Sequence, residues 1–195
     1  MKFFIASKNK HKIAEFVRIL EPMNIEVISE ADLVAPLTEV EETGKTFEEN
    51  AIIKAKSGLK HTGLMSVADD SGLCVDYLDG APGVFSARFS GLHGDDDSNN
   101  RKLLELLDGV PYEKRTAKYV AAIACIFPDG REFTVRGECH GHISDTPAGD
   151  NGFGYDPYFI SELGCFGVIS AEEKDSISHR GKALKLFVEE LKKYL

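Results

Sequence analysis

The sequence predicts an α/β fold, and three features of the chain carry that prediction. Residues 3–28 have the order strand, loop, helix, strand, which is the usual opening of an α/β layer fold. A hairpin pattern surrounds residues 128–130, and its first arm is apolar on both sides, as expected for a strand inside a sheet. Residues 183–191 repeat apolar side chains at helical spacing. Helices packed against a sheet account for all three.

The composition narrows the class of protein. The chain has 195 residues, of which 43% are hydrophobic and 28% charged, as is typical of a soluble globular protein. This length suits one domain, or one domain with a small lobe. The formal net charge of -9 argues against a general nucleic-acid-binding surface. A few local lysines and arginines can still bind a small anionic substrate.

Targeting and cysteine patterns point to a cytoplasmic protein. No apolar run approaches the ~18 residues that a membrane span requires, and the N-terminus lacks a signal-peptide pattern. The four cysteines are scattered without a C-x-x-C pair, so reduced and mostly buried thiols are expected. His140 and His142 have no further Cys or His at ligand spacing, and a structural zinc site is therefore not expected.

The elements follow in order from the N-terminus. Phe3–Ala6 reads as a buried strand, apolar residues from Ile13 to Leu20 mark the inner face of a helix that ends before Pro22, and Ile25–Ile28 is a second strand. Thr46 and Glu49 then form a capping-box pattern that opens a helix ending near Gly63.

The middle of the chain contains adjacent carboxylates. Met65–Val67 reads as a short strand that empties into a turn at Asp69–Gly72, and Leu73–Tyr77 reads as the next strand. On an extended backbone Asp69 and Asp70 point in opposite directions, so that one can face a reaction site while the other supports it. The alternative interpretation is a solvated turn.

The second half contains a helix, a hairpin and a loop. Residues 95–100 open a helix that Gly109 terminates, and Tyr119–Phe127 pairs with Arg131–Cys139 across a Pro-Asp-Gly turn. Residues 141–157 are too rich in Gly, Asp and Pro to be regular throughout.

Four polar clusters are candidates for chemistry. The first is Ser7-x-Asn9-x-x-Lys12, where a strand runs into a helix N-terminus. Free N–H groups and the helix dipole make such a junction an anion site, and Lys12 adds a positive charge. The alternative is an ordinary capped surface helix.

The second cluster is acidic. Glu41 and Glu42 precede one helix, and Asp69 and Asp70 follow a strand. Carboxylates that converge from different segments suit Mg²⁺, which binds through one or two carboxylates plus substrate phosphates. A solvated acidic loop is the alternative for the two glutamates. Lys54, on the helix after that loop, can reach either phosphate or solvent.

The third and fourth clusters suit a nucleotide base. Gly152-Phe153-Gly154-Tyr155-Asp156-Pro157 places aromatic rings between glycines, and such rings need a partner, either a stacked purine or the protein core. Lys174 with Ser178-His179-Arg180 could bind phosphate or donate to carbonyl oxygens of a base. A charged helix entry is the alternative, although cations at a helix N-terminus are unfavourable.

With these clusters in this order, the chain resembles the inosine triphosphate pyrophosphatase family nearly end to end. The motifs that carry the resemblance are Ser7-x-Asn9-x-x-Lys12, Glu42-Thr43-Gly44-x-Thr46-Phe47-x-Glu49-Asn50-Ala51, Ala68-Asp69-Asp70-Ser71-Gly72-Leu73, Gly80-x-Pro82-Gly83-x-x-Ser86-Ala87-Arg88, Gly152-Phe153-Gly154-Tyr155-Asp156-Pro157 and Ser178-His179-Arg180.

The resemblance implies a fold and an activity. The fold is a two-lobed mixed β-sheet core flanked by helices, within a single domain over residues 1–195, with the active-site cleft between the lobes. The reaction is hydrolysis of ITP, dITP and XTP to the nucleoside monophosphate and pyrophosphate, which cleans the nucleotide pool. Mg²⁺ dependence and a homodimer are also implied.

The resemblance also implies roles by position. Asp70 is the proton acceptor or a magnesium-linked base, with Asp69 and one of Glu41 or Glu42 beside the metal. The triphosphate is held by Ser7, Asn9, Lys12, Lys54 and Ser71. The base pocket consists of Phe153, Gly154, Tyr155, Asp156, Lys174, Ser178, His179 and Arg180. One departure is the apolar stretch 165–169, where relatives usually carry an acidic residue.

Two rival functions remain open from the sequence. One is a pyrophosphatase of similar architecture that acts on modified pyrimidine or methylated nucleotides. The other is a nucleotide-binding sensor without turnover. Turnover of ITP with Mg²⁺ excludes the sensor, and a panel of triphosphates separates the two enzymes.

Overall fold

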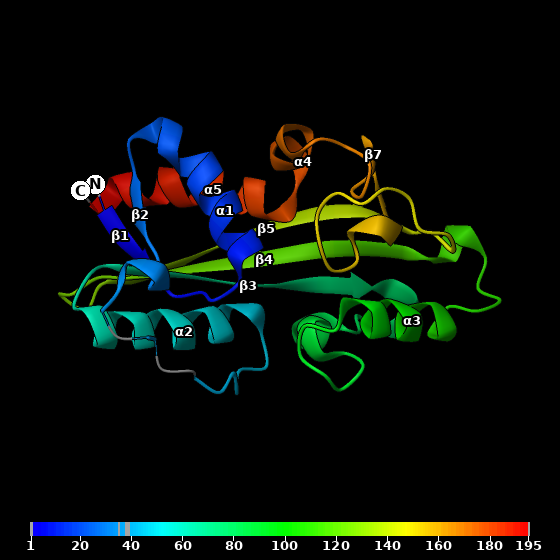
Figure 1. Ribbon diagram of the computed structural model, residues 1–195, viewed down its shortest axis with the longest axis horizontal. Helices are drawn as coiled ribbons and strands as arrows, with labels where there is room; N and C mark the ends of the chain where they lie inside the picture. Colours follow the sequence, from blue (N-terminus) through cyan, green and yellow to red (C-terminus); the bar gives the residue numbers. More distant parts are fainter. Residues whose placement is uncertain (1, 35, 38–39, 195) are drawn as a thin grey trace. The chain divides into compact units, whose positions relative to one another are not determined.

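A computed structural model describes residues 2–34, 36–37 and 40–194, and the chain within it divides into two compact units. The first unit comprises Met1–Asp70, Ala121–Gly137 and Arg180–Leu195, and the second comprises Ser71–Val120 and Glu138–His179. The strands form a seven-stranded sheet in the order β2-β1-β3-β4-β5-β6-β7 (Figure 1). The pairs β1–β2 and β1–β3 are parallel, whereas β5–β6 and β6–β7 are antiparallel, so the sheet is mixed and the predicted α/β class is confirmed.

The first unit has helices on both faces of its strands. α1 and α5 lie on one face and α2 on the other (Figure 1). Phe3, Phe16 and Phe187 belong to the core on the side of α1 and α5, and Ala51 and Ala55 of α2 belong to the core on the opposite side. The elements are β1 (Lys2–Ile5), α1 (Lys10–Leu20), β2 (Glu26–Ile28), α2 (Phe47–Thr62) and α5 (His179–Leu191), with the halves of β3, β4 and β5 that belong to this unit.

α2 begins and ends as the capping pattern predicts. The Thr46 hydroxyl accepts from the Glu49 amide at 3.2 Å, and the Glu49 carboxylate accepts from the Thr46 amide at 3.3 Å. Gly63 closes the helix with a φ of 70°, a left-handed conformation that glycine adopts at little cost. The cap therefore sets the position of Asn50 and Lys54 along the helix.

The predicted turn at Asp69–Gly72 is wrong. β3 runs from Ser66 to Val75 without interruption, and nearly all of its residues are buried. Two aspartates are tolerated inside this strand because both are paired with cations, which offsets the cost of burying a charge. The prediction that the two side chains point in opposite directions agrees with their partners, because Asp70 contacts Asn50 of α2 and Asp69 contacts Arg180 of α5.

The second unit is built on the other halves of the long strands. β4 (Thr116–Ile126) and β5 (Glu132–Ile143) form the predicted hairpin, and β4 is buried along most of its length. The remaining elements are α3 (Asp96–Leu106), β6 (Phe159–Ser161), β7 (Gly164–Cys165) and α4 (Ala171–Ile177). Leu103 of α3 and Leu107, the residue directly after α3, belong to a core that also contains Phe159 and Phe166.

Two further expectations concern cysteines and membranes. All four cysteines are free thiols, and all except Cys74 are buried, as predicted. Among the helices that the structure describes, none combines the length and the apolar character needed to cross a bilayer.

Candidate active site

The first unit contains a buried ionic cluster. It consists of Asp69 and Asp70 on β3, Lys12 on α1, Lys54 on α2 and Arg180 on α5, together with Glu15 and Glu42. Glu15 and Arg180, which form an ion pair, are 165 positions apart in the sequence. The fold therefore gathers the two predicted phosphate-binding lysines with three of the four predicted acids, Glu42, Asp69 and Asp70.

Asp69 is the structural acid of the ionic cluster. Its two carboxylate oxygens accept from Nε and Nη2 of Arg180, each at 3.3 Å, and it also pairs with Lys12. Burial alone would raise the pKa of Asp69, but the guanidinium of Arg180 and the ammonium of Lys12 outweigh it and hold that pKa well below its usual range. Asp69 is therefore ionised and committed to its cationic partners.

Asp70 differs from its neighbour. Its carboxylate accepts from Lys54 Nζ at 2.7 Å and from the side-chain amide of Asn50 at 3.3 Å. Burial raises the pKa of Asp70 above its ordinary value, despite the opposing effect of Lys54. A carboxylate with a raised pKa is a better proton acceptor, which suits a general base.

The two lysines have different electrostatic environments. Burial is the largest influence on both, and it lowers the pKa of Lys12 in spite of the Asp69 carboxylate. For Lys54 the carboxylates of Asp70 and Glu42 overcome burial and raise the pKa. Lys54 Nζ lies 3.1 Å from a Glu42 oxygen, so two acids converge on one cation.

The structure separates the two predicted glutamates. Glu42 is partly buried and belongs to the ionic cluster, whereas Glu41 is exposed. Within the described part of the chain, no group of three His, Cys, Asp or Glu side chains is arranged to hold a metal. Two acids that meet at one cation still fit Mg²⁺, because that ion takes one or two protein carboxylates and completes its shell with phosphates and water.

Asn9 caps α1, which is the alternative interpretation of the first motif. Its Oδ1 accepts from the amides of His11 at 3.0 Å and Lys12 at 3.2 Å. The Ser7 hydroxyl in turn accepts from the Asn9 amide at 3.2 Å. The cap places Lys12 in the first turn of α1, and a phosphate contact by Ser7 or Asn9 remains a prediction.

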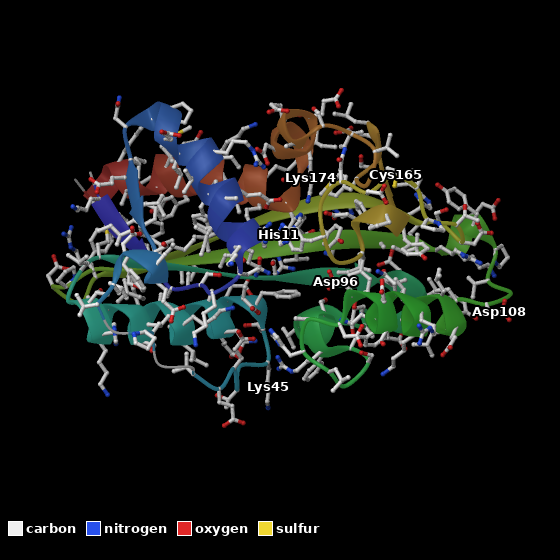
Figure 2. The ribbon with its side chains drawn as sticks, viewed as in Figure 1. His11, Lys45, Asp96, Asp108, Cys165 and Lys174 are labelled. Atoms are coloured by element: carbon white, nitrogen blue, oxygen red, sulfur yellow. The ribbon has the colours of Figure 1, made fainter. Side chains whose placement is uncertain are left out.

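The second unit contains the aromatic residues predicted for the base, which we call the base cluster. Asp156 is only 2% exposed, and its Oδ2 accepts from the Phe153 amide at 2.9 Å and from Lys174 Nζ at 2.7 Å. Lys174 extends from α4 (Figure 2), and its ammonium lies 5.0 Å from the centroid of the Phe153 ring. One carboxylate thus fixes both the aromatic loop and the cation beside it.

Tyr119 and His179 extend the base cluster. Their rings stack at a centroid distance of 4.7 Å. Burial, followed by the nearby Asp156 carboxylate, raises the pKa of Tyr119 well above its ordinary value, so this phenol is neutral. Tyr119 was not predicted, because an aromatic residue in a buried strand carries no local sign of a functional role.

Two features hold the aromatic loop in shape. Gly152 has a φ of 78°, and a Cβ there would lie 2.0 Å from Asp156 Oδ2, so only glycine fits. On the other side, the Gly154 amide donates to Asp96 at 2.8 Å, and Asn100 donates to the Gly154 carbonyl at 2.9 Å. Asp96 lies at the start of α3 (Figure 2).

Tyr155 and Phe153 have different environments. Tyr155 is 4% exposed, belongs to the core, and donates through its hydroxyl to the Ser86 carbonyl at 2.8 Å. The alternative interpretation, an aromatic that pins the loop to the protein, therefore describes Tyr155. Phe153 is partly exposed, and its ring lies under the ammonium of Lys174.

Arg180, predicted for the base pocket, belongs to the ionic cluster. It is 1% exposed, and its guanidinium pairs with Glu15 as well as Asp69. The sequence could not assign this pairing, because His179 and Arg180 are neighbours in the chain yet belong to different units. Of the remaining predicted residues, Ser178 is buried and its amide donates to the Lys174 carbonyl at 2.7 Å, while Ser71 is partly buried on β3.

Comparison with known proteins gives consistent results. The Ham1 family matches residues 3–190. The chain is 50% identical to a protein of Mycobacteroides abscessus named dITP/XTP pyrophosphatase, with 94% of this chain and 91% of the relative covered. It is 48% identical to a protein of the same name from Geobacter sulfurreducens, with 97% and 96% covered. The structure of the Staphylococcus aureus Ham1 protein is 38% identical, covers 100% of both chains and superposes with a TM-score of 0.87.

Proposed function

Because this chain belongs to the Ham1 family, we propose that it is a pyrophosphatase that hydrolyses dITP, ITP and XTP to the nucleoside monophosphate and pyrophosphate. Such an enzyme cleans the nucleotide pool of non-standard purines. The observation that carries the proposal is the pairing of a buried Asp70, whose pKa is raised, with the ammonium of Lys54 2.7 Å away. The names of its relatives support the choice of substrate.

The ionic cluster supplies the groups that the reaction requires. Asp70 accepts a proton from the attacking water or orients that water. Lys12 and Lys54 bind the triphosphate and stabilise negative charge that develops on the leaving pyrophosphate. Asp69 keeps Lys12 in place and is itself fixed by Arg180. The departing group is an anion, so cations are needed where the bond breaks.

Mg²⁺ is the proposed metal, and Glu42 and Asp70 are the residues that would hold it. The convergence of both acids on Lys54 supports this assignment, with contacts of 3.1 and 2.7 Å. When bound with substrate phosphates, the ion neutralises charge on the oxygens of the triphosphate. Glu41, being exposed, is not included.

The base cluster is proposed to select 6-oxopurines. Hypoxanthine and xanthine present a carbonyl oxygen at position 6, which accepts from a donor such as Lys174, whereas adenine presents an amino group there. A donor that adenine cannot satisfy would be left without a partner on desolvation, which is costly. Phe153 offers a ring face for stacking. Asp156 holds Lys174 in position for this contact.

Two further expectations concern assembly and location. The family resemblance implies a homodimer, and the targeting and cysteine patterns of the sequence favour the cytoplasm. Neither nucleic acid nor a membrane is expected as a partner. Sedimentation of the purified protein at several concentrations tests the first expectation.

A substrate panel tests the function. Purified protein with Mg²⁺ is expected to release pyrophosphate repeatedly from dITP, ITP and XTP, and to act on ATP with a kcat/KM lower by about 10⁴-fold. Removing the metal with EDTA is expected to stop turnover, and added Mg²⁺ to restore it. Equal activity on ATP would contradict the substrate assignment. Preference for modified pyrimidines would favour the related pyrophosphatase, and binding without turnover would favour a sensor.

Replacing Asp156 by Asn is expected to weaken base selectivity. The amide oxygen can still accept from the Phe153 amide, but the side chain no longer supplies a charge that holds the Lys174 ammonium. A hydrogen bond to a charged group contributes about 1.5–3 kcal/mol, so the ratio of kcat/KM for ITP over ATP should fall roughly tenfold or more. The control is Glu172→Gln, which neutralises an exposed acid on α4, the helix that carries Lys174. A ratio that stays the same in Asp156→Asn would remove Asp156 from the selectivity mechanism.

A further inference from the structure

Asn50 is a buried amide that contacts Asp70 of the ionic cluster. It stands in one of the motifs that carry the family resemblance, but the proposed mechanism gives it no role. It lies in the first turn of α2, four residues before Lys54, and its exposed fraction is 0%. A fully buried amide is costly unless its donors and acceptor are satisfied. Its partners therefore indicate what it does.

Both ends of the Asn50 amide contact a segment that carries one of the two proposed metal-binding acids. Nδ2 donates to Asp70 Oδ2 at 3.3 Å, and Oδ1 accepts from the Gly44 amide at 2.8 Å. The orientation is determined by chemistry, because only the amide oxygen can accept from a backbone N–H. Gly44 lies two residues after Glu42, so this bond anchors the acidic loop.

The space around Gly44 shows how closely the acidic loop packs on the amide. A Cβ at Gly44 would lie 2.6 Å from Asn50 Oδ1, 2.7 Å from the Glu49 Cβ and 2.9 Å from the Asn50 amide nitrogen. Any side chain at position 44 would push the loop away from α2. Glycine at this position thus allows the bond on which the inference depends.

We propose that Asn50 is a positioning residue that holds Asp70 and the Glu42 loop together, so that both acids meet at the metal. The inference rests on the proposed function, since it concerns the same metal site. Lys54 Nζ reaches both acids, which shows that they already point to a common place. Residues that orient metal ligands typically affect metal affinity or activity by about 10–100-fold when they are changed.

The test compares two buried asparagines that hold loops in the same way. Asn99 on α3 is 2% exposed, and its Oδ1 accepts from the Ser90 amide at 2.7 Å. Asn50→Leu and Asn99→Leu therefore both remove a helix-to-loop bond from a buried position. Both are expected to lower the thermal unfolding midpoint, but only Asn50→Leu is expected to change the response to Mg²⁺.

The readouts separate positioning from general stability. In Asn50→Leu the Mg²⁺ concentration for half-maximal turnover of dITP should rise about tenfold or more, and kcat should fall, while KM for dITP at saturating Mg²⁺ stays within about threefold. A second readout needs no turnover. With inorganic pyrophosphate present, Mg²⁺ should raise the unfolding midpoint of the wild-type protein and of Asn99→Leu at lower concentrations than it does for Asn50→Leu.

Gly44→Ala provides an independent variant. It leaves the Asn50 side chain intact but breaks its bond to the loop, so the half-saturating Mg²⁺ concentration should again rise. Because both changes break the same contact, the double variant should show little more than the effect of Asn50→Leu alone. If Asn50→Leu does not fold, the Mg²⁺ response of Gly44→Ala alone tests the proposed role of Asn50.

Three results would overturn the inference. The first is an unchanged Mg²⁺ response in both Asn50→Leu and Gly44→Ala. The second is a change in the Mg²⁺ response of Asn99→Leu as large as that of Asn50→Leu. The third is additive effects in the variant that combines Asn50→Leu with Gly44→Ala. Failure of the proposed function has a different signature, because the wild-type protein would then release no pyrophosphate from any triphosphate. The effect of Mg²⁺ and pyrophosphate on the unfolding midpoint would still decide the role of Asn50.

Discussion

Asp70→Asn is expected to lower kcat for dITP hydrolysis by about 10²–10⁴-fold, the range that a general base contributes. The amide cannot accept a proton from water and carries no charge for a metal, yet it has the same shape as the carboxylate. The contact with Lys54 can be retained through the amide oxygen, so the fold should survive. KM for dITP should change much less than kcat if Asp70 acts on the transition state.

The controls for this variant address folding and general charge effects. Circular dichroism and the thermal unfolding midpoint should be close to those of the wild-type protein. Asp108, labelled in Figure 2, is exposed, and Asp108→Asn should retain full activity. A kcat within a few fold of wild type in Asp70→Asn would exclude Asp70 as the base and leave the ionic cluster with a binding role only.

Arg180→Met is expected to lower the free energy of unfolding by about 3–5 kcal/mol. The guanidinium is buried between Glu15 and Asp69, and burial would lower the pKa of Arg180 were it not raised by these two carboxylates. Removing the cation leaves two buried acids with less compensation. Activity should fall as well, because Asp69 also holds Lys12.

The destabilisation caused by Arg180→Met should depend on pH. The pKa of Asp69 is lower in the folded protein than its unfolded value of about 3.9. Such a group contributes stability above the unfolded pKa, and the contribution is lost as the pH falls through the folded pKa. The loss in the free energy of unfolding caused by Arg180→Met should therefore be largest from about pH 5 upwards. It should become smaller at lower pH, where Asp69 of the variant takes up a proton.

Denaturant unfolding of both proteins across this pH range measures the effect. Arg136→Met is a matched control, since Arg136 pairs with Glu48 at 2.9 Å near the surface and its side chain is 39% exposed. Pairs of that kind contribute about 0–1 kcal/mol. A loss below about 1 kcal/mol in Arg180→Met, or a loss independent of pH, would show that the buried pairing does not stabilise the fold.

Short sequence patterns correctly predicted the features that depend on interactions between residues close together in the chain. The capping box at Thr46 and Glu49 and the left-handed Gly63 both lie where they were expected, because each is decided within one turn of helix. The pattern missed the continuity of β3. Adjacent aspartates and a glycine favour a turn locally. A buried strand is stable at Asp69 and Asp70 because cationic side chains from distant segments offset the cost of burying the two carboxylates.

The residues missed from sequence have a common feature. Glu15, Asn50 and Tyr119 are residue types that occur in any helix or strand, and their positions in the candidate site depend on contacts with segments far along the chain. Arg180 was predicted to line the base pocket, and in the structure its guanidinium pairs with Glu15 and Asp69. A motif identifies a residue without identifying its partner.

The sequence by itself determined which chemical groups the protein has, where α2 is capped, and that Asp70 is the residue to test first. Only the tertiary structure decided that Asp69 is a structural anion while Asp70 is a candidate base. The two residues are identical and adjacent in the chain, but their proton affinities depend on burial and on neighbouring charges. Those neighbours come from helices α1, α2 and α5, and local sequence has no means of placing them.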